Sequence, residues 1–123
     1  MQDFKGKRIA AYARTSTDKQ QATSIPDQLR LCREYAERRG GTLVEALAFS
    51  DGAKSGSTAS RPGLDRLKAA LCRGQVDVIL TEDLSRIGRS TGNNDQLLKQ
   101  IRAYGVRFIA ISDGLDTGCS LEG

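Results

Sequence analysis

Short apolar runs typical of β-strands alternate along this chain with stretches of helical periodicity, and no other feature limits the possible fold so strongly. The expected strands cover residues 8 to 14, 42 to 49, 76 to 81 and 106 to 112. The expected helices cover residues 24 to 41, 63 to 74 and 90 to 105. This alternation predicts a three-layer α/β fold with a mostly parallel central sheet of four to five strands flanked by helices. The 123 residues are enough for a single domain that spans residues 1 to 123.

The first expected helix begins and ends at clear sequence signals. Ser24 can cap its first turn, Asp27 completes a capping box with that serine, and Pro26 is suited to the first turn. Glycines at positions 40 and 41 end the helical pattern. These signals predict a helix over residues 24 to 41.

The longest polar stretch, “SDGAKSGSTASRPG”, covers residues 50 to 63 and consists mostly of small and turn-forming residues. We expect it to form a mobile loop, most of all between residues 52 and 60. Arg61 lies near the end of this stretch, directly before the next expected helix.

The chain contains no histidine and three cysteines, which narrows the chemistry available to it. Histidine is the most common general base and metal ligand in proteins. Cys32, Cys72 and Cys119 form no CxxC pair, and their odd number argues against a disulfide framework. Cys32 and Cys72 fall on apolar positions of expected helices and are interpreted as small core residues. We therefore expect neither a metal nor another cofactor.

The basic residues of the chain are mostly arginine. The formal net charge is +4, and 13 of the 19 basic residues are arginines. Arginine binds phosphate through a planar fork of donors, whereas lysine acts as a point charge. An arginine-rich basic domain is typical of a protein with a polyanionic partner. A solvated basic surface explains the charge alone equally well.

Polar and charged residues gather where the expected strands end. Arg14 and Ser16 follow the first strand, and Asp51 follows the second. The third strand is followed by “EDLSRIGRS”, residues 82 to 90, and the fourth ends at Ser112. Ligands of open parallel sheets bind at the carboxyl ends of the strands. The sequence therefore predicts a site with a serine and several arginines at one edge of the sheet.

A serine beside several arginines can react with a phosphodiester without histidine or metal. The serine hydroxyl needs activation at neutral pH, and guanidinium groups can stabilise the charge that gathers on the non-bridging phosphate oxygens. The candidates are Ser16 as nucleophile and Arg14, Arg61, Arg86 and Arg89 as phosphate ligands. Arg14 and Ser16 share a face if the first strand reaches residue 16, and Arg86 and Arg89 share a side if residues 84 to 90 form a helical turn. Taken singly, each arginine is also explained as a solvated charge.

Five segments of the chain, in order and spacing, resemble the catalytic domain of the serine recombinases, which include resolvases, DNA invertases and larger integrases. The segments are “YARTSTDKQ”, “SIPDQ”, “FSDGAKSGSTASRPGLDRL”, “VDVILTEDLSRIGRS” and “GVRFIAISDGLDT”. The resemblance covers residues 8 to 118 or so, which is nearly the whole chain. It implies a resolvase-like catalytic fold.

The resemblance implies a site-specific DNA recombinase that cleaves and rejoins strands without metal or ATP. Ser16 would attack a DNA phosphodiester and become joined to the 5′ phosphate, leaving a free 3′ hydroxyl. The phosphoserine ester would keep the energy of the broken bond for rejoining. The residues that match the family's site are the phosphate-binding Arg14, Arg61, Arg86 and Arg89 and the supporting Gln28 and Asp51. Tyr12 matches the start of the first motif, and a packed aromatic ring explains it equally well.

Two positions depart from the family's pattern. Many relatives carry an aspartate directly before the first arginine of the “R-x-x-R” pair, where this chain has Ser85. An acid–base role of that aspartate therefore does not transfer to this chain, and Asp83 is a poor substitute for it. Relatives can also carry a lysine in the helix after the polar loop, where this chain has Ala70. The sequence leaves open whether Lys68 replaces it.

Family members continue past this point into a long helix that builds the dimer and tetramer, and then into a DNA-binding domain. The resemblance therefore implies that residues 1 to 123 are a catalytic domain without those parts. The partner would be double-stranded DNA at a recombination site, and the full-length protein would form dimers and tetramers. We expect the isolated chain to be a monomer or weak dimer that does not recombine DNA.

The sequence gives no sign of a membrane partner. No stretch approaches the ~20 apolar residues of a membrane span, and the N-terminal residues contain no signal-peptide core. We therefore expect a cytoplasmic protein, encoded by a bacterium or phage and associated with the nucleoid.

Two alternatives remain open at the level of sequence. The first is a phospho-receiver or nucleotide-binding α/β domain, which has the same alternation of elements. A receiver requires an acidic pair after the first strand, and a nucleotide binder requires a Gly-rich turn there, but this chain has “TSTDKQQ”. The second is a non-catalytic DNA-docking domain of the same fold. The intact Ser16 argues against this second alternative without removing it.

Overall fold

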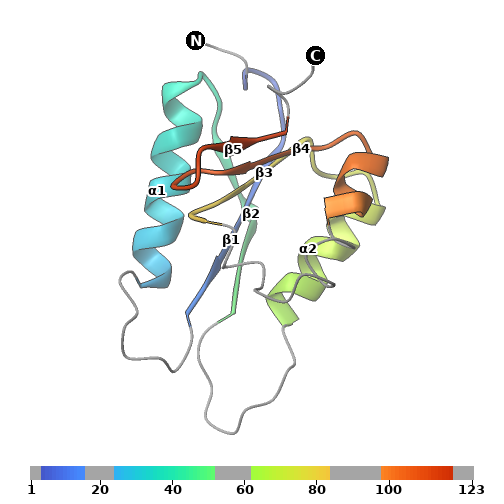
Figure 1. Cartoon of the computed structure of the whole chain (residues 1–123), viewed down its shortest axis with the longest axis horizontal. Helices are drawn as coiled ribbons and strands as arrows, with labels where there is room; N and C mark the ends of the chain where they lie inside the picture. Colours follow the sequence, from blue (N-terminus) through green and yellow to red (C-terminus); the bar gives the residue numbers. More distant parts are fainter. Residues whose placement is uncertain (1–3, 16–23, 52–61, 84–97, 118–123) are drawn as a thin grey trace, which may run out of the picture.

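A computed structural model shows a five-stranded sheet with helices on both faces (Figure 1). It describes residues 4–15, 24–51, 62–83 and 98–117. The strands are β1 (Ile9–Arg14), β2 (Leu43–Asp51), β3 (Val78–Thr81), β4 (Arg107–Ala110) and β5 (Leu115–Asp116). The helices are α1 (Ile25–Arg38) and α2 (Pro62–Cys72), and residues 98–103 are also helical. The expected helix at 90 to 105 is thus confirmed over its described end, and its beginning lies outside the described residues.

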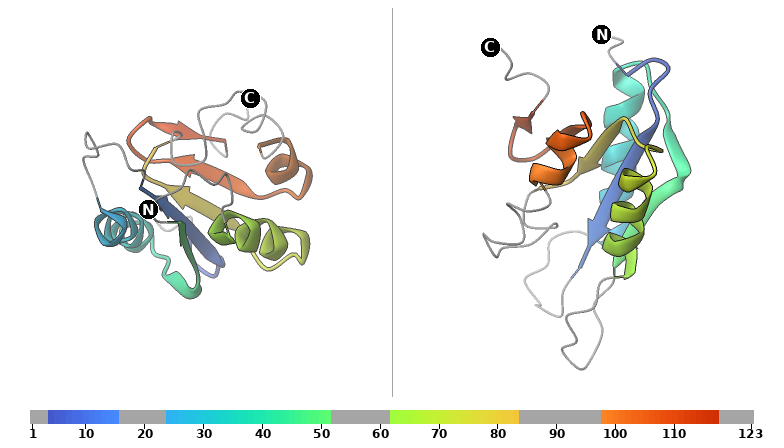
Figure 2. Two further views of the ribbon diagram at one scale, coloured as in Figure 1. Left: turned by 90° about the horizontal axis from the view of Figure 1, so that it is seen from below. Right: turned by 90° about the vertical axis from the view of Figure 1, so that its right-hand side faces the viewer.

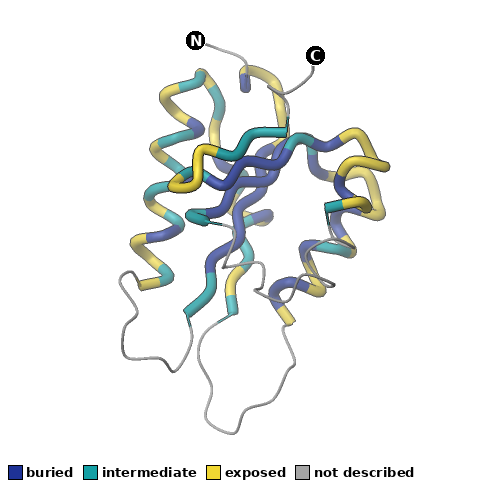
Figure 3. The backbone as a smooth tube through the Cα atoms, viewed as in Figure 1, coloured by how far each residue is buried: buried dark blue, intermediate teal, exposed yellow. Residues whose placement is uncertain are grey.

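The strand order is β2-β1-β3-β4-β5, and every pair is parallel except β4 with β5. The expected mostly parallel sheet in a three-layer fold is therefore confirmed. β1 and β3 lie inside the sheet, and all four residues of β3 are buried (Figure 3). This burial on both faces explains why the segment is continuously apolar rather than alternating.

The two faces of the sheet are covered by different helices (Figure 2). Along β1, Ile9 and Ala11 belong to the core cluster that contains Cys32 and Ala36 of α1. The alternate residues Ala10 and Tyr12 belong to the second cluster, which contains the apolar residues of α2. Successive side chains of a strand point to opposite faces, so this central strand contributes to both cores.

The beginning of α1 follows the expected capping pattern. The Ser24 hydroxyl accepts a hydrogen bond from the Asp27 backbone N–H at 3.3 Å. A side-chain hydrogen bond from Ser24, together with one from the Arg30 guanidinium at 2.7 Å, holds the pKa of Asp27 below its usual value. The helix ends at Arg38, and Gly40 follows with a φ of 86°. A left-handed conformation of this kind favours glycine and does not continue an α-helix, which explains why α1 ends just before Gly40.

β5 was not among the strands assigned from sequence. It contains two residues, too few to produce a periodic pattern, and pairs antiparallel with β4. The Arg107 guanidinium donates two hydrogen bonds to the Asp116 carboxylate at 2.8 and 2.7 Å. The Thr117 hydroxyl also accepts the Phe108 backbone N–H at 3.0 Å. Side-chain pairing therefore stabilises a strand that is too short to be predicted from sequence.

The register between β1 and β2 is interrupted near the amino-terminal end of both strands. Ile9 pairs with Leu43, whereas Ala11 pairs with Ala48, so β2 contains extra residues between these two positions. Glu45 lies in this interval and forms an exposed ion pair with Arg33 of α1 at 3.2 Å. From Ala11 onward the two strands stay in register to the end of β1.

The prediction that two cysteines are core residues is correct for Cys32 and wrong for Cys72. Cys32 is fully buried on the inner face of α1, while Cys72 is exposed at the last position of α2. The buried stripe of α2 ends at Leu71, and one further residue turns the side chain by about 100° away from it. The Tyr104 hydroxyl donates to the Cys72 sulfur at 3.4 Å.

These two environments predict very different thiol reactivity. Burial, and secondarily the charge of Glu82, raises the pKa of Cys32 from 9.0 to about 12, so at pH 8 its thiolate fraction falls roughly a thousandfold. In a Cys119→Ser background, we expect a disulfide reagent at pH 8 to modify one thiol rapidly and the other only after denaturation. Cys72→Ser should remove the rapid reaction. A rapid reaction that persists in Cys72→Ser would contradict the buried position of Cys32.

Among the described residues, no helix has the length and apolar character that crossing a membrane requires.

Candidate active site

The carboxyl ends of the parallel strands meet at one edge of the sheet, where the sequence predicted the site. Arg14, the last residue of β1, is the ladder partner of Asp51, the last residue of β2. The Thr15 backbone N–H donates to the Asp51 carbonyl at 3.2 Å. Thr81, at the end of β3, pairs with Tyr12 on one side and with Ala110 on the other. The ends of the first and second strands are thus joined directly.

Several of the predicted site residues lie outside the described residues. They are Ser16, Arg61, Ser85, Arg86 and Arg89. The expected mobile loop between residues 52 and 60 also falls outside them. β1 ends at Arg14, so the strand itself does not reach position 16. The roles assigned to these residues from sequence stay predictions.

Gln28 is buried in the first turns of α1 and binds the backbone of Arg14. The Gln28 side-chain oxygen accepts the Arg14 N–H at 2.9 Å, and its side-chain nitrogen donates to the Arg14 carbonyl at 3.0 Å. Only 1 % of Gln28 is exposed, so water does not replace these bonds. The amide thus pairs with both backbone groups of one residue, as a neighbouring strand would do. Gln28 therefore fixes the conformation of the chain two residues before Ser16.

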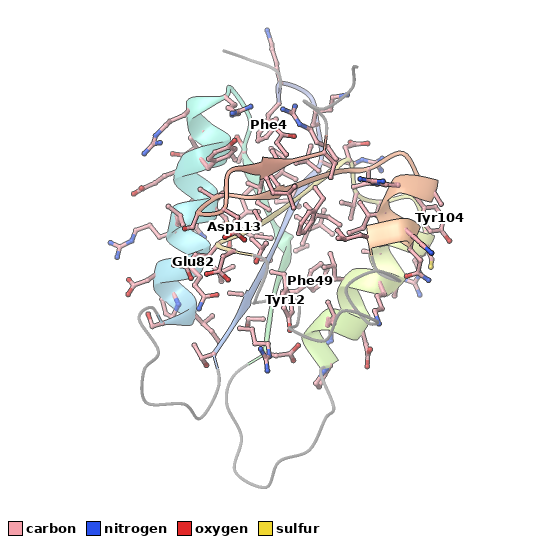
Figure 4. All side chains as sticks on the ribbon, in the orientation of Figure 1. Phe4, Tyr12, Phe49, Glu82, Tyr104 and Asp113 are labelled. Atoms are coloured by element: carbon pink, nitrogen blue, oxygen red, sulfur yellow. The ribbon has the colours of Figure 1, made fainter. Side chains whose placement is uncertain are left out.

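Tyr12 and Asp51 are joined side chain to side chain. The Tyr12 hydroxyl donates to the Asp51 Oδ2 at 2.6 Å. The Tyr12 ring is fully buried in the core cluster under α2, and Phe49 lies on the same side of the sheet (Figure 4). Tyr12 is therefore a packed aromatic residue, which was one of the two interpretations of its place in the sequence. Its hydroxyl also reaches the edge of the sheet where the site is predicted.

The Asp51 carboxylate binds the start of α2. Its Oδ1 accepts the Gly63 N–H at 2.8 Å, and its Oδ2 accepts the Leu64 N–H at 3.0 Å. The first N–H groups of a helix have no partner within the helix, and a negative charge there is favoured by the helix dipole. Asp51 therefore supplies partners that the helix itself cannot, and it connects the end of β2 to α2.

Gly63 allows α2 to begin in contact with β2. A β-carbon at position 63 would lie 2.3 Å from the Ser50 carbonyl oxygen and 2.8 Å from its carbon. No side chain larger than hydrogen fits there without a shift of the backbone. The sequence did not indicate this close approach, because a single glycine in a helix has no pattern that distinguishes it.

The end of β3 carries a buried hydroxyl and an acidic residue. The Thr81 hydroxyl donates to the Tyr12 carbonyl at 3.0 Å, so it links β3 to β1 at the edge of the sheet. Glu82 is half-buried and lies with Asp113 toward α1, on the opposite side of the sheet from Tyr12 (Figure 4). The sequence reasoning missed Thr81 because a single threonine at the end of an apolar strand has no distinguishing pattern.

The position where relatives can carry a lysine points into the core of this chain. Ala70 is 5 % exposed and belongs to the cluster between α2 and the sheet. Lys68 is half-exposed on the same helix. A lysine at position 70 would bury its charge in an apolar cluster at considerable cost, which gives a physical reason for the alanine.

The described residues thus form a mostly parallel α/β sheet whose strand ends are joined by polar side chains at one edge. Residues 9–120 match the family described as “Resolvase, N terminal domain”. The chain therefore belongs to the resolvase N-terminal domain family, and the resemblance to the serine recombinases is confirmed.

Curated relatives carry recombination functions in their names. The chain is 39% identical over 110 residues to the transposon Tn3 resolvase of Escherichia coli, a match that covers 89% of the chain and 53% of the relative. It is 33% identical over 109 residues to the DNA-invertase of Escherichia phage P1, which covers 89% of the chain and 51% of the relative. The chain thus spans about half the length of the curated relatives it matches.

Solved structures have the same fold. The N-terminal catalytic domain of TP901-1 integrase superposes with a TM-score of 0.79 at 28% identity, covering 94% of this chain and 85% of the integrase chain. The C-terminal catalytic domain of ISC1926 TnpA, an IS607-like serine recombinase, superposes with a TM-score of 0.68 at 27% identity, covering 83% and 68% of the two chains. The predicted fold class is therefore confirmed both by the strand order of the sheet and by its similarity to these solved structures.

Proposed function

We propose that this chain is the catalytic domain of a site-specific DNA recombinase and that Ser16 is its nucleophile. The observation that supports this best is the pair of hydrogen bonds from buried Gln28 to the backbone of Arg14. These bonds hold the strand end rigidly only two residues before the serine, at the edge of the sheet where open α/β proteins bind ligands. Membership in a family of resolvases and invertases supplies the reaction class.

The proposed reaction exchanges one phosphodiester for another. The Ser16 oxygen forms a bond to phosphorus, the bond from phosphorus to the 3′ oxygen breaks, and that oxygen leaves with a proton. The serine proton passes to solvent. The resulting phosphoserine ester retains a bond of similar energy, so attack by a 3′ hydroxyl reverses the step and rejoins the strand without ATP.

Arginines would replace the metal ions that many other phosphoryl-transfer enzymes use. Arg14, Arg61, Arg86 and Arg89 are the proposed ligands of the non-bridging phosphate oxygens. A fixed guanidinium typically lowers the barrier of such a step by about 3 kcal/mol. Their positive charge would also lower the pKa of the Ser16 hydroxyl, which is the activation that we propose in place of a dedicated base. Ser85 has no carboxyl group and therefore does not supply the acid–base role of the aspartate that many relatives carry there.

The partners of the whole protein are part of the same proposal. The substrate is double-stranded DNA at a recombination site, and pairs of such sites are brought together by dimers that assemble into a tetramer. Acting on chromosomal DNA would associate the protein with the nucleoid. The alternative of a phospho-receiver or nucleotide-binding domain lacks support, because neither matches the family to which the chain belongs. A non-catalytic DNA-docking domain remains a possible outcome of the following test.

The test is to trap the covalent intermediate and map it. The full-length protein is incubated with sheared and nicked genomic DNA of the organism that encodes it, so that short cleaved ends diffuse away and cannot be rejoined. We expect a DNA adduct that survives denaturation, and mass spectrometry of its peptides should locate the nucleotide on Ser16. Sequencing the attached DNA would identify the recombination site. A protein that binds DNA but forms no adduct would be a docking domain.

A further inference from the structure

Four residues tie the ends of β1 and β2 to the first turn of α2, and we call Tyr12, Asp51, Gly63 and Leu64 the strand–helix clamp. The Asp51 carboxylate accepts hydrogen bonds from the Gly63 N–H at 2.8 Å, the Leu64 N–H at 3.0 Å and the Tyr12 hydroxyl at 2.6 Å. The Asp51 carbonyl also accepts the Thr15 N–H at 3.2 Å. One residue thus connects three elements at the edge of the sheet.

The clamp leaves little room for adjustment. Tyr12 is fully buried, and its ring is packed in the core cluster under α2. Gly63 approaches the Ser50 backbone so closely that a β-carbon would lie 2.3 Å from the carbonyl oxygen. Buried, hydrogen-bonded contacts of this kind hold a helix end in one position, because every displacement leaves a buried polar group without its partner.

Two residues beside the clamp, Pro62 before Gly63 and Thr15 on the Asp51 carbonyl, are joined along the chain to two proposed reacting groups. Arg61 directly precedes Pro62, the first residue of α2, and Ser16 directly follows Thr15. Adjacent Cα atoms are separated by about 3.8 Å whatever the conformation of the intervening peptide. Because Thr15 and Pro62 are fixed relative to each other, the distance between the Cα atoms of Ser16 and Arg61 is limited.

We propose that Asp51 and Tyr12 are positioning residues of the cleavage reaction, which act by fixing the start of α2 and thereby Arg61 against the strand that leads to Ser16. The proposal rests on the proposed function. In this assignment the Asp51 carboxylate serves as a hydrogen-bond acceptor for Gly63, Leu64 and Tyr12, and not as the base that deprotonates Ser16.

A double-mutant cycle in the full-length protein tests this assignment. Asp51→Asn replaces one carboxylate oxygen with an amide NH2 group, which cannot accept from the Gly63 or Leu64 N–H that faces it. A misplacement of a reacting group by about 1 Å typically costs about a hundredfold in rate. We expect adduct formation to slow by about that factor in Asp51→Asn. Arg61→Ala should slow it by about a hundredfold to a thousandfold. In the Arg61→Ala background, the further effect of Asp51→Asn on the rate should shrink to about threefold or less. Both changes remove the contribution of a correctly placed Arg61 guanidinium, so the second change has little left to remove.

Controls separate positioning from folding and from catalysis. Asp65→Asn makes the same chemical change at an exposed position of the same helix end and should leave the rate unaltered. Tyr12→Phe removes one hydroxyl from the clamp and should slow adduct formation less than Asp51→Asn does. In the Arg61→Ala background, the effect of Tyr12→Phe on the rate should also shrink. The pH profile of adduct formation should keep its shape in Asp51→Asn, whereas a lost limb would identify Asp51 as a base and overturn the proposal.

Amide hydrogen exchange gives a readout that does not depend on activity. In Asp51→Asn, whichever of the Gly63 and Leu64 amides faces the new NH2 group should exchange about tenfold faster than in the unaltered protein, since a lost hydrogen bond of typical strength changes the opening equilibrium by that factor. Additive effects of Asp51→Asn and Arg61→Ala, or unchanged exchange at both Gly63 and Leu64, would each overturn the positioning role. If the unaltered protein forms no adduct, the proposed function fails, and the exchange experiment then decides the clamp separately.

Discussion

Ser16→Ala is expected to abolish the covalent protein–DNA adduct completely. The adduct requires an oxygen on the attacking side chain, and an alanine at position 16 offers none. Because activation of a nucleophile depends on the groups placed around it, a neighbouring hydroxyl cannot take over the attack. Denaturing electrophoresis of the full-length variant with nicked genomic DNA measures the result, and binding to DNA should be retained.

Thr17→Ala is the matched control for this variant. It removes a hydroxyl next to the proposed nucleophile in the sequence, and adduct formation should persist. An adduct in Ser16→Ala, or its loss in Thr17→Ala alone, would move the nucleophile away from Ser16. The same pair of variants separates a recombinase from a DNA-docking domain, because a docking domain would be indifferent to both.

Gln28→Leu is expected to cause a large loss of folding stability. Leucine retains the approximate volume of glutamine but removes both hydrogen bonds to the Arg14 backbone. A buried backbone group left without a partner costs about 1 to 3 kcal/mol, so two such groups predict a loss of about 2 to 6 kcal/mol in the free energy of unfolding. Denaturant titration of the 123-residue chain measures this change.

Glu37→Leu is the matched control, since it makes a similar polar-to-apolar change at an exposed position of the same helix. It should change the free energy of unfolding by less than about 0.5 kcal/mol. A loss of similar size in both variants would mean that the effect belongs to α1 as a whole and not to the bonds with Arg14. In the full-length protein, Gln28→Leu should also slow adduct formation.

The order of strands and helices could be predicted from sequence because it depends on local periodicity. The end of β2 was predicted less well. The expected strand stopped at residue 49, but Ser50 and Asp51 extend it by pairing with Ala13 and Arg14. Two polar residues at a strand end resemble a loop when read locally, and only the ladder with β1 makes them part of the sheet.

The resemblance implied that Gln28 and Asp51 support the site, and that role stays a prediction. It did not indicate that both side chains bind backbone groups, as the structure shows. Tyr12 and Asp51 are 39 residues apart, and Gln28 is 14 residues from Arg14. Hydrogen bonds over such separations depend on the packed fold, so no local pattern of residue types can indicate them.

The interrupted register of β2 has a consequence for how the protein behaves at high concentration. β2 is an edge strand, and edge strands offer unpaired backbone groups on which a second molecule can build a continuous intermolecular sheet. The extra residues between Leu43 and Ala48 break the regular spacing of those groups, and the charged Glu45 lies within the break. An incoming strand would find only short regular stretches to pair with, which opposes fibril-like association through this edge.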